Sequence, residues 1–238
     1  MSRILDALKK DMGQANDLSL RLRRVDGIKL YPSPSPEQER ELSRLCGRLL
    51  GLKAEGDGMS FAFAATASGE GTSFISYNVA CLLAAAYDQK VVWVEGNYLS
   101  PQMKLMGSKV DTLATLLQDP RRVVDLPDFP QPLLVPAGAE LGRFRGLFNE
   151  ERYAQLLNAL RERFDFVIMD LPPVRECSET ALMAQEIDGL LLVVEQQFLK
   201  WEIINEGVRS LREMGVNVLG AVVNKRRYDL PGVLYKHL

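Results

Sequence analysis

The sequence predicts an α/β protein, with a doubly wound, mostly parallel sheet that carries helices on both faces. From residue 59 onward, short apolar segments alternate with amphipathic helical segments. Several of the apolar segments have no polar face, which is typical of parallel strands covered on both sides. A glycine-bearing turn, Gly69 to Gly71, stands between the first strand and the helix that follows. A strand, a turn of this kind and a helix N-terminus together form an anion site.

Residues 1–36 differ from the rest and are predicted to form a docking helix and a flexible linker. The short helix would carry its apolar residues on one face, namely Ile4, Leu5, Leu8 and Met12. Alternating prolines from Pro32 to Pro36 then fix φ and remove hydrogen-bond donors, which favours an extended linker. The α/β domain is expected over residues 37–238 and should begin with a helix from Glu37 to about Leu52.

The remaining elements follow in the order strand, helix, strand. The expected strands are Met59–Ala65, Lys90–Val94, Pro132–Val135, Phe164–Met169, Gly189–Val194 and Val216–Val223. Two amphipathic helices are expected, from about Asn149 to Arg163 and from about Phe198 to Met214. Sheets of this type bind ligands at the carboxyl ends of their strands, so the functional side chains should gather there.

Composition excludes several classes of protein. The chain has 238 residues, is 47% hydrophobic and carries a net charge of −2, so it is neither a disordered protein nor a general nucleic-acid binder. Its longest apolar run, Val79–Tyr87, is too short to span a membrane, and no signal peptide is seen, so we expect a cytoplasmic protein. The single histidine, His237, argues against histidine-based metal and triad sites. The three cysteines should be reduced thiols.

The turn after the first strand only partly fits a phosphate loop. In the pattern G-x-x-x-x-G-K-[ST], Gly71 and Ser73 fit, whereas Thr66 stands at the first glycine and Thr72 at the lysine. Taken alone, the turn is equally consistent with a tight loop that binds nothing. The candidate nucleotide-binding residues in this loop are Gly69, Glu70, Gly71, Thr72 and Ser73.

Three later strand ends strengthen the interpretation. They read Glu95-Gly96-Asn97, then Asp170-Leu171-Pro172-Pro173, and finally Val222-Val223-Asn224. In this order and spacing, and over roughly residues 37–225, the chain resembles the bacterial tyrosine kinases of capsular and exopolysaccharide loci. That family belongs to the class of P-loop ATPases that includes the MinD and ParA proteins.

The resemblance implies roles for individual residues. Asp170 would be the Walker B carboxylate, Glu95 would stand at the Walker A′ position, and Asn224 would contact adenine. Ser73 and Asp170 would hold Mg²⁺. By the same resemblance, Glu41 and Arg44 would lie at a subunit interface, and the tail tyrosines Tyr228 and Tyr235 would be phosphoacceptors. From the residues alone, Asp170 has an alternative interpretation as a solvated strand-end carboxylate, Asn224 as a polar strand cap, and Glu41 with Arg44 as a surface pair.

The departures from the family fall on catalytic positions. The lysine that clamps the terminal phosphates is Thr72 here, and the Walker A′ pair of aspartates has become Glu95 and Asn97. We therefore expect ATP or ADP with Mg²⁺ to bind weakly or not at all.

The predicted function is that of a tyrosine-kinase-like protein of exopolysaccharide or capsule biosynthesis that is catalytically impaired and acts as a regulator or scaffold. Its expected partner is a membrane protein of the chain-length or co-polymerase type, which would hold it at the inner membrane, and it could form a homo-oligomer or a hetero-oligomer with a related kinase. One alternative is an active ATP-dependent protein tyrosine autokinase with a divergent P-loop. Another is a MinD/ParA-type positioning ATPase.

Overall fold

The structure is a computed structural model, and it describes residues 31–53, 58–103, 111–127, 132–138, 149–196 and 201–225. Its centre is a six-stranded sheet with the order β3-β2-β4-β1-β5-β6. The strands are β1 (Met59–Ala65), β2 (Val91–Glu95), β3 (Leu133–Val135), β4 (Phe166–Asp170), β5 (Gly189–Glu195) and β6 (Val218–Asn224). Every pairing between neighbours is parallel, which confirms the predicted fold class.

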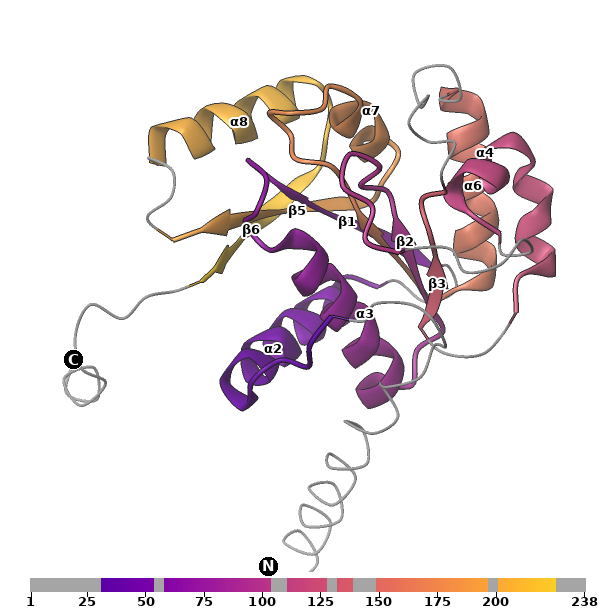
Figure 1. The fold of residues 1–238 in the computed structure, drawn as a ribbon, viewed down its shortest axis with the longest axis horizontal. Helices are drawn as coiled ribbons and strands as arrows, with labels where there is room; N and C mark the ends of the chain where they lie inside the picture. The colour runs from indigo at the N-terminus through magenta and orange to yellow at the C-terminus, as the bar shows by residue number, and fades with distance from the viewer. Residues whose placement is uncertain are drawn as a thin grey trace, which may run out of the picture.

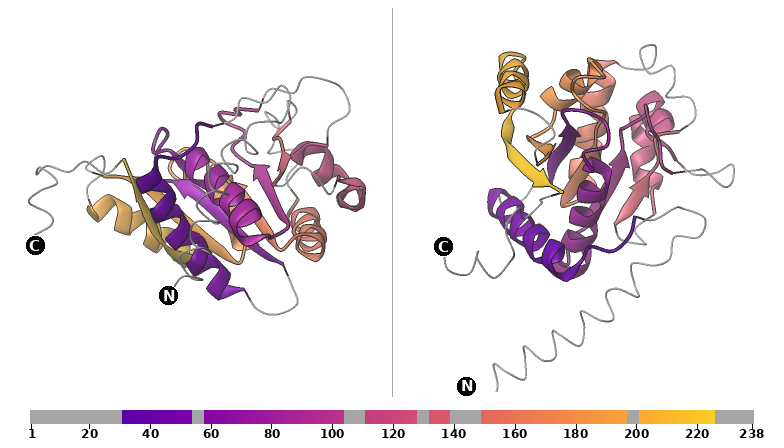
Figure 2. Two further views of the ribbon diagram at one scale, coloured as in Figure 1. Left: turned by 90° about the horizontal axis from the view of Figure 1, so that it is seen from below. Right: turned by 60° about the vertical axis from the view of Figure 1, so that its left-hand side comes forward.

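Helices cover both faces of this sheet, as Figures 1 and 2 show. One face carries α2 (Pro36–Leu52) and α3 (Thr72–Tyr87). The other carries α4 (Leu113–Gln118), the 3₁₀ helix η1 (Pro120–Asp125), α6 (Glu150–Arg163), α7 (Glu179–Gln185) and α8 (Trp201–Glu213). Strand side chains alternate between the two cores: Phe61 and Phe63 of β1 face α2 and α3, whereas Ala62 and Ala64 face the other layer.

Local signals explain most element boundaries. Ser35 caps α2 in a capping box with Gln38, and Pro36 occupies the first turn, so α2 begins one residue before the position expected. Asn149 caps α6 by accepting a hydrogen bond from the backbone of Arg152. Sequence analysis missed α4, η1 and α7, which have six or seven residues each and are too short to show a helical period.

Two further predictions can be compared with this part of the chain. Among the described residues, no helix is long and apolar enough to cross a membrane. The three cysteines form no disulfide, as predicted, and all three are buried. The predicted helix over residues 4–12 lies outside the described residues.

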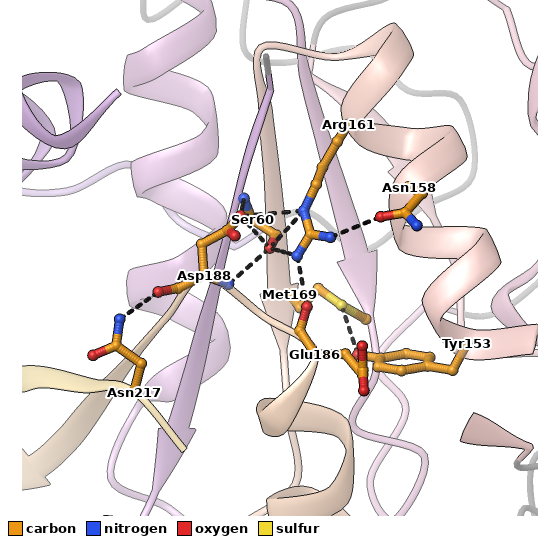
Figure 3. Close-up of polar contacts among 8 residues, drawn as sticks. All are labelled: Ser60, Tyr153, Asn158, Arg161, Met169, Glu186, Asp188 and Asn217. Carbon is orange, nitrogen blue, oxygen red and sulfur yellow. Dashed lines mark hydrogen bonds and ion pairs between the residues drawn. The ribbon is translucent and has the colours of Figure 1, made fainter. Parts of the chain in front are cut away.

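A polar network holds the end of the sheet opposite to the strands' carboxyl ends (Figure 3). The Ser60 hydroxyl donates to Asp188 Oδ2 at 2.8 Å and accepts from Arg161 Nη2 at 2.7 Å. The Arg161 guanidinium also forms an ion pair with Asp188 at 3.1 Å and donates to the carbonyl oxygen of Glu186 at 2.6 Å. Asn217 donates to the carbonyl oxygen of Asp188 at 2.6 Å. The network joins α6 to β1 and to the segments before β5 and β6, so its role is to fix the sheet.

Candidate functional site

The predicted carboxylates meet at the carboxyl ends of the central strands. In the strand register, Asp170 at the end of β4 lies beside Glu95 at the end of β2 and beside Phe63 of β1. Both carboxylates are only 1% exposed. The sheet thus brings two side chains that are 75 positions apart to the edge where ligands bind in this class of fold.

The phosphate-loop candidate connects β1 to α3. Gly69 and Gly71 have φ of +89° and +90°, a left-handed conformation that glycine adopts readily. Gly71 is the N-cap of α3, and no side chain caps this 16-residue helix. Thr72, at the position of the family lysine, is 7% exposed, and its hydroxyl is buried without a hydrogen bond. An uncapped helix N-terminus with an unpaired hydroxyl is suited to an anionic ligand.

Glu70 turns its carboxylate back into the loop. Oε2 accepts hydrogen bonds from the backbone N–H of Thr66 at 2.7 Å and of Ala67 at 3.0 Å, and from the Thr66 hydroxyl at 2.7 Å. Oε1 accepts from the backbone N–H of Glu195 at 3.1 Å. We predicted Glu70 as a nucleotide-binding residue; in the structure its side chain serves the loop itself, so only its backbone is left for a nucleotide.

Two other segments brace the same loop. Glu176, which follows β4, accepts from the backbone N–H and the hydroxyl of Ser68 at 2.7 and 2.6 Å, and these bonds lower the pKa of Glu176. Asn224 donates from Nδ2 to the carbonyl oxygen of Glu70 at 2.8 Å. This bond favours a bracing role for Asn224 over the adenine contact that the resemblance implied. Sequence reasoning did not single out Glu176, because a lone carboxylate in a loop carries no motif.

Lys225 places a cation next to the loop. Its Nζ donates to the carbonyl oxygen of Gly69 at 2.7 Å and pairs with Glu195 Oε2 at 2.8 Å. Its φ of +50° is unusual for a residue other than glycine. Sequence analysis did not single out Lys225 either, because it lies 153 positions after Thr72, the position that lacks the lysine.

Asp170 is the most perturbed acid of the site. Burial raises its pKa to about 7; the Ser73 hydroxyl opposes the shift and the neighbouring Glu95 carboxylate adds to it. Asp170 Oδ1 is buried without a hydrogen bond. An unpaired buried carboxylate oxygen beside a serine hydroxyl fits the predicted Mg²⁺ ligands, Asp170 and Ser73. The described residues contain no group of three His, Cys, Asp or Glu side chains that could hold a metal, so such an ion would also need phosphate oxygens or water.

Glu95 is committed to the backbone. Its Oε1 accepts from the N–H of Gln102 at 2.6 Å and of Met103 at 3.0 Å, and its Oε2 accepts from the N–H of Ala137 at 3.1 Å. Three backbone bonds to one carboxylate hold the loop after β2 against the segment after β3. We predicted Glu95 as a catalytic residue. In the structure its carboxylate holds two loops together, and its catalytic role stays a prediction.

Tyr31, just before α2, also reaches the site. Its ring lies 5.5 Å from that of Tyr77 on α3. Its hydroxyl is buried without a hydrogen bond. Burial raises the pKa of Tyr31 to about 12; Ser73 opposes the shift, and the charges of Asp170 and Glu95 add to it. The sequence analysis had placed this residue in the linker.

The predicted interface residues lie on α2, and the predicted tail tyrosines lie outside the described residues. Glu41 and Arg44 form an ion pair of 2.7 Å on α2 with both side chains well exposed, so they present the geometry of a surface pair. Their interface role stays a prediction. Tyr228 and Tyr235 lie outside the described residues, and their role as phosphoacceptors stays a prediction as well.

Comparisons with known proteins find similarity to bacterial tyrosine kinases. No family model matches the chain. The tyrosine-protein kinase CpsD of Streptococcus agalactiae serotype III is 24% identical over 163 residues, which cover 66% of this chain and 70% of CpsD.

Solved structures show the same fold. The kinase domain of the Escherichia coli tyrosine kinase ETK superposes with a TM-score of 0.65 at 18% identity, over 82% of this chain and 79% of that domain. A ParA family ATPase from Chlorobium tepidum superposes with a TM-score of 0.57 at 16% identity, over 75% of this chain and 78% of the ATPase.

Proposed function

The chain is a MinD/ParA-like P-loop protein related to the bacterial tyrosine kinases, and on that premise we propose that it is a catalytically impaired relative which regulates or scaffolds a capsule or exopolysaccharide machine. The observation that carries this proposal is Thr72. It occupies the position where the family has a lysine, and it offers a buried, unpaired hydroxyl in place of a cation. Phosphoryl transfer depends on positioning and on neutralising charge at the terminal phosphate, and the loss of one aimed donor costs about 10²–10³ in rate at comparable sites.

The remaining parts of the site support weak nucleotide binding. The uncapped N-terminus of α3 can receive phosphate oxygens through its backbone N–H groups. Ser73 and Asp170 would hold Mg²⁺, which would supply positive charge next to the phosphates. Glu95, in contrast, already accepts three backbone hydrogen bonds, so it is poorly suited to act on a nucleophile or on metal-bound water.

The proposed partner is a membrane protein of the chain-length or co-polymerase type. Support comes from the relatives, which include a kinase named CpsD, and from the predicted docking helix in residues 1–36. Attachment through such a partner would place the protein at the inner face of the membrane.

A charge-restoring variant tests the impairment. We expect wild-type protein to form no phosphotyrosine with Mg²⁺–ATP when it is assayed by mass spectrometry. Thr72→Lys should bind fluorescent ATP with Mg²⁺ more tightly, because its ammonium returns to the phosphate position. Thr72→Met is the matched control, since it adds a side chain of similar length without charge. Robust autophosphorylation of the wild type would rule out the proposal.

Lys225 favours a second candidate, an active kinase whose cation comes from the residue directly after β6. Its Nζ already lies 2.7 Å from the carbonyl oxygen of Gly69 in the loop. If it serves the phosphate, then phosphotyrosine formation should fall in Lys225→Gln and persist in Lys225→Arg. Equal behaviour of these two variants would exclude this candidate.

A further inference from the structure

Tyr31 is held against the wall of the site by aromatic contacts. Its ring lies 5.5 Å from Tyr77, which meets Trp93 of β2 edge-on at 5.8 Å. Tyr77 follows Ser73 by one helical turn on α3, so the two residues share a face of the helix. Tyr31 therefore packs on the face of α3 that leads to the phosphate loop.

The hydroxyl of Tyr31 is buried and forms no hydrogen bond of normal geometry. The polar groups that act on it are the Ser73 hydroxyl and the carboxylates of Asp170 and Glu95. Asp170 Oδ1 is itself buried without a hydrogen bond, and Asp170 is 1% exposed. Buried polar groups are normally satisfied, so two unpaired oxygens in one site are suited to contact a polar ligand.

We propose that Tyr31 is an intramolecular occupant of the phosphate end of this site, so that it and a Mg²⁺–nucleoside triphosphate exclude each other. Ser73 and Asp170 are the residues that would hold the ion, and the ring of Tyr31 packs on Tyr77, one helical turn after Ser73. A bound ion and terminal phosphate would need that space, so the segment that begins at Tyr31 must withdraw first. The proposal rests on the proposed function only in taking residues 66–73 as a phosphate loop.

If Tyr31 and the nucleotide exclude each other, nucleotide binding and release of residues 31–35 are thermodynamically linked. A site that is closed for nine-tenths of the time binds its ligand about tenfold more weakly than an open one. Anything that draws residues 31–35 away would raise nucleotide affinity, and a bound nucleotide would favour release of the segment by the same factor. Residues 31–35 belong to the predicted linker between the docking helix and the α/β domain, so a partner bound to that helix could act on the site through Tyr31.

Nucleotide affinity of Tyr31 variants tests the proposal. In the full chain, Tyr31→Ala should bind fluorescent ATP with Mg²⁺ about tenfold more tightly than the wild type, because the site stays open. Tyr31→Phe should bind nearly as weakly as the wild type, since its ring still fills the space. The control is Tyr87→Ala at the far end of α3, where the hydroxyl bonds to the carbonyl oxygen of Ser43; this variant should not change affinity.

Each other outcome overturns the proposal. Weaker binding by Tyr31→Ala would make the phenol a ligand contact, and equal binding, or binding by neither protein, would show that Tyr31 does not close the site. Tyr31→Leu covers the case in which Tyr31→Ala fails to fold, because leucine keeps the apolar contact with Tyr77 but is too short to reach Ser73; it should also bind more tightly. Phosphotyrosine formation by the wild type would overturn the proposed function. The affinities of the Tyr31 variants would still test whether Tyr31 closes the site.

Discussion

The carboxylate of Glu70 accepts a hydrogen bond from both the backbone N–H and the hydroxyl of Thr66, each at 2.7 Å. Glu70 is 1% exposed and Thr66 is 3% exposed, so both bonds are shielded from water. The first residue of the phosphate loop is thereby tied to the residue four positions further on, and these bonds help to fix the shape of the loop.

Glu70→Ala should destabilise the protein by about 2–4 kcal/mol, because it leaves buried backbone N–H groups without an acceptor. Urea unfolding monitored by circular dichroism measures this change. The matched control is Glu176→Ala, which removes an exposed carboxylate from the same loop and should cost less than about 1 kcal/mol. Equal losses in the two variants would show that the burial of Glu70 does not matter.

Gly71→Ala should be more harmful than Gly69→Ala. Both glycines have φ near +90°, so either alanine is strained by about 1–2 kcal/mol. A Cβ on Gly71 would also lie 2.3 Å from Asn224 Nδ2, whereas a Cβ on Gly69 would have nothing within 4 Å. We expect an additional loss of about 1–3 kcal/mol for Gly71→Ala from this overlap. Urea unfolding of both variants gives the difference, and Asn224→Ala in the Gly71→Ala background should recover part of it.

Asp170→Asn should change how stability depends on pH. The pKa of Asp170 is raised from 3.8 to about 7, chiefly by burial, so the folded state holds its proton more tightly than the unfolded state. Below pH 4 both states are protonated and the carboxyl has no effect. Between pH 4 and 7 only the unfolded state ionises, so wild-type stability falls as the pH rises, and above pH 7 the full cost remains.

Asn cannot ionise, so Asp170→Asn should gain stability relative to the wild type between pH 5 and 8, by up to a few kcal/mol on the scale of about 1.4 kcal/mol per pKa unit. Urea unfolding at pH 5, 6, 7 and 8 measures the gain. The exposed Asp125→Asn controls for net charge. Parallel profiles for Asp170→Asn and the wild type would contradict the raised pKa.

Ser60→Ala tests the network of Figure 3. The hydroxyl joins Asp188 and Arg161 and is fully buried, so its loss should cost about 1–3 kcal/mol in urea unfolding. Nucleotide affinity should stay unchanged, because the network lies at the other end of the sheet. Asn158→Ala removes only a 3.1 Å contact with Arg161 at an exposed position and should be nearly neutral. If Asn158→Ala lost as much stability as Ser60→Ala, the contacts of the Arg161 guanidinium, and not the Ser60 hydroxyl, would be the main source of stability in the network.

Sequence alone determined the fold class and the edge at which the site lies. Alternating strands and helices, strands apolar on both faces and a glycine turn before α3 are local patterns, and each depends on residues a few positions apart. For the same reason the ends of all six strands were predicted to within two residues, with Asp170 and Glu95 where parallel strands bring them together.

Only the tertiary structure decided where the side chains of the site are directed. Glu70 bonds to Glu195, Ser68 to Glu176 and Asn224 to Glu70, across 125, 108 and 154 positions of the chain. Tyr31 reaches Tyr77 from a proline-rich stretch that predicts only extended backbone. A motif states which groups a loop contains, but the partner of a buried polar group is chosen by the donors and acceptors that folding brings near, and those have no fixed spacing in the sequence.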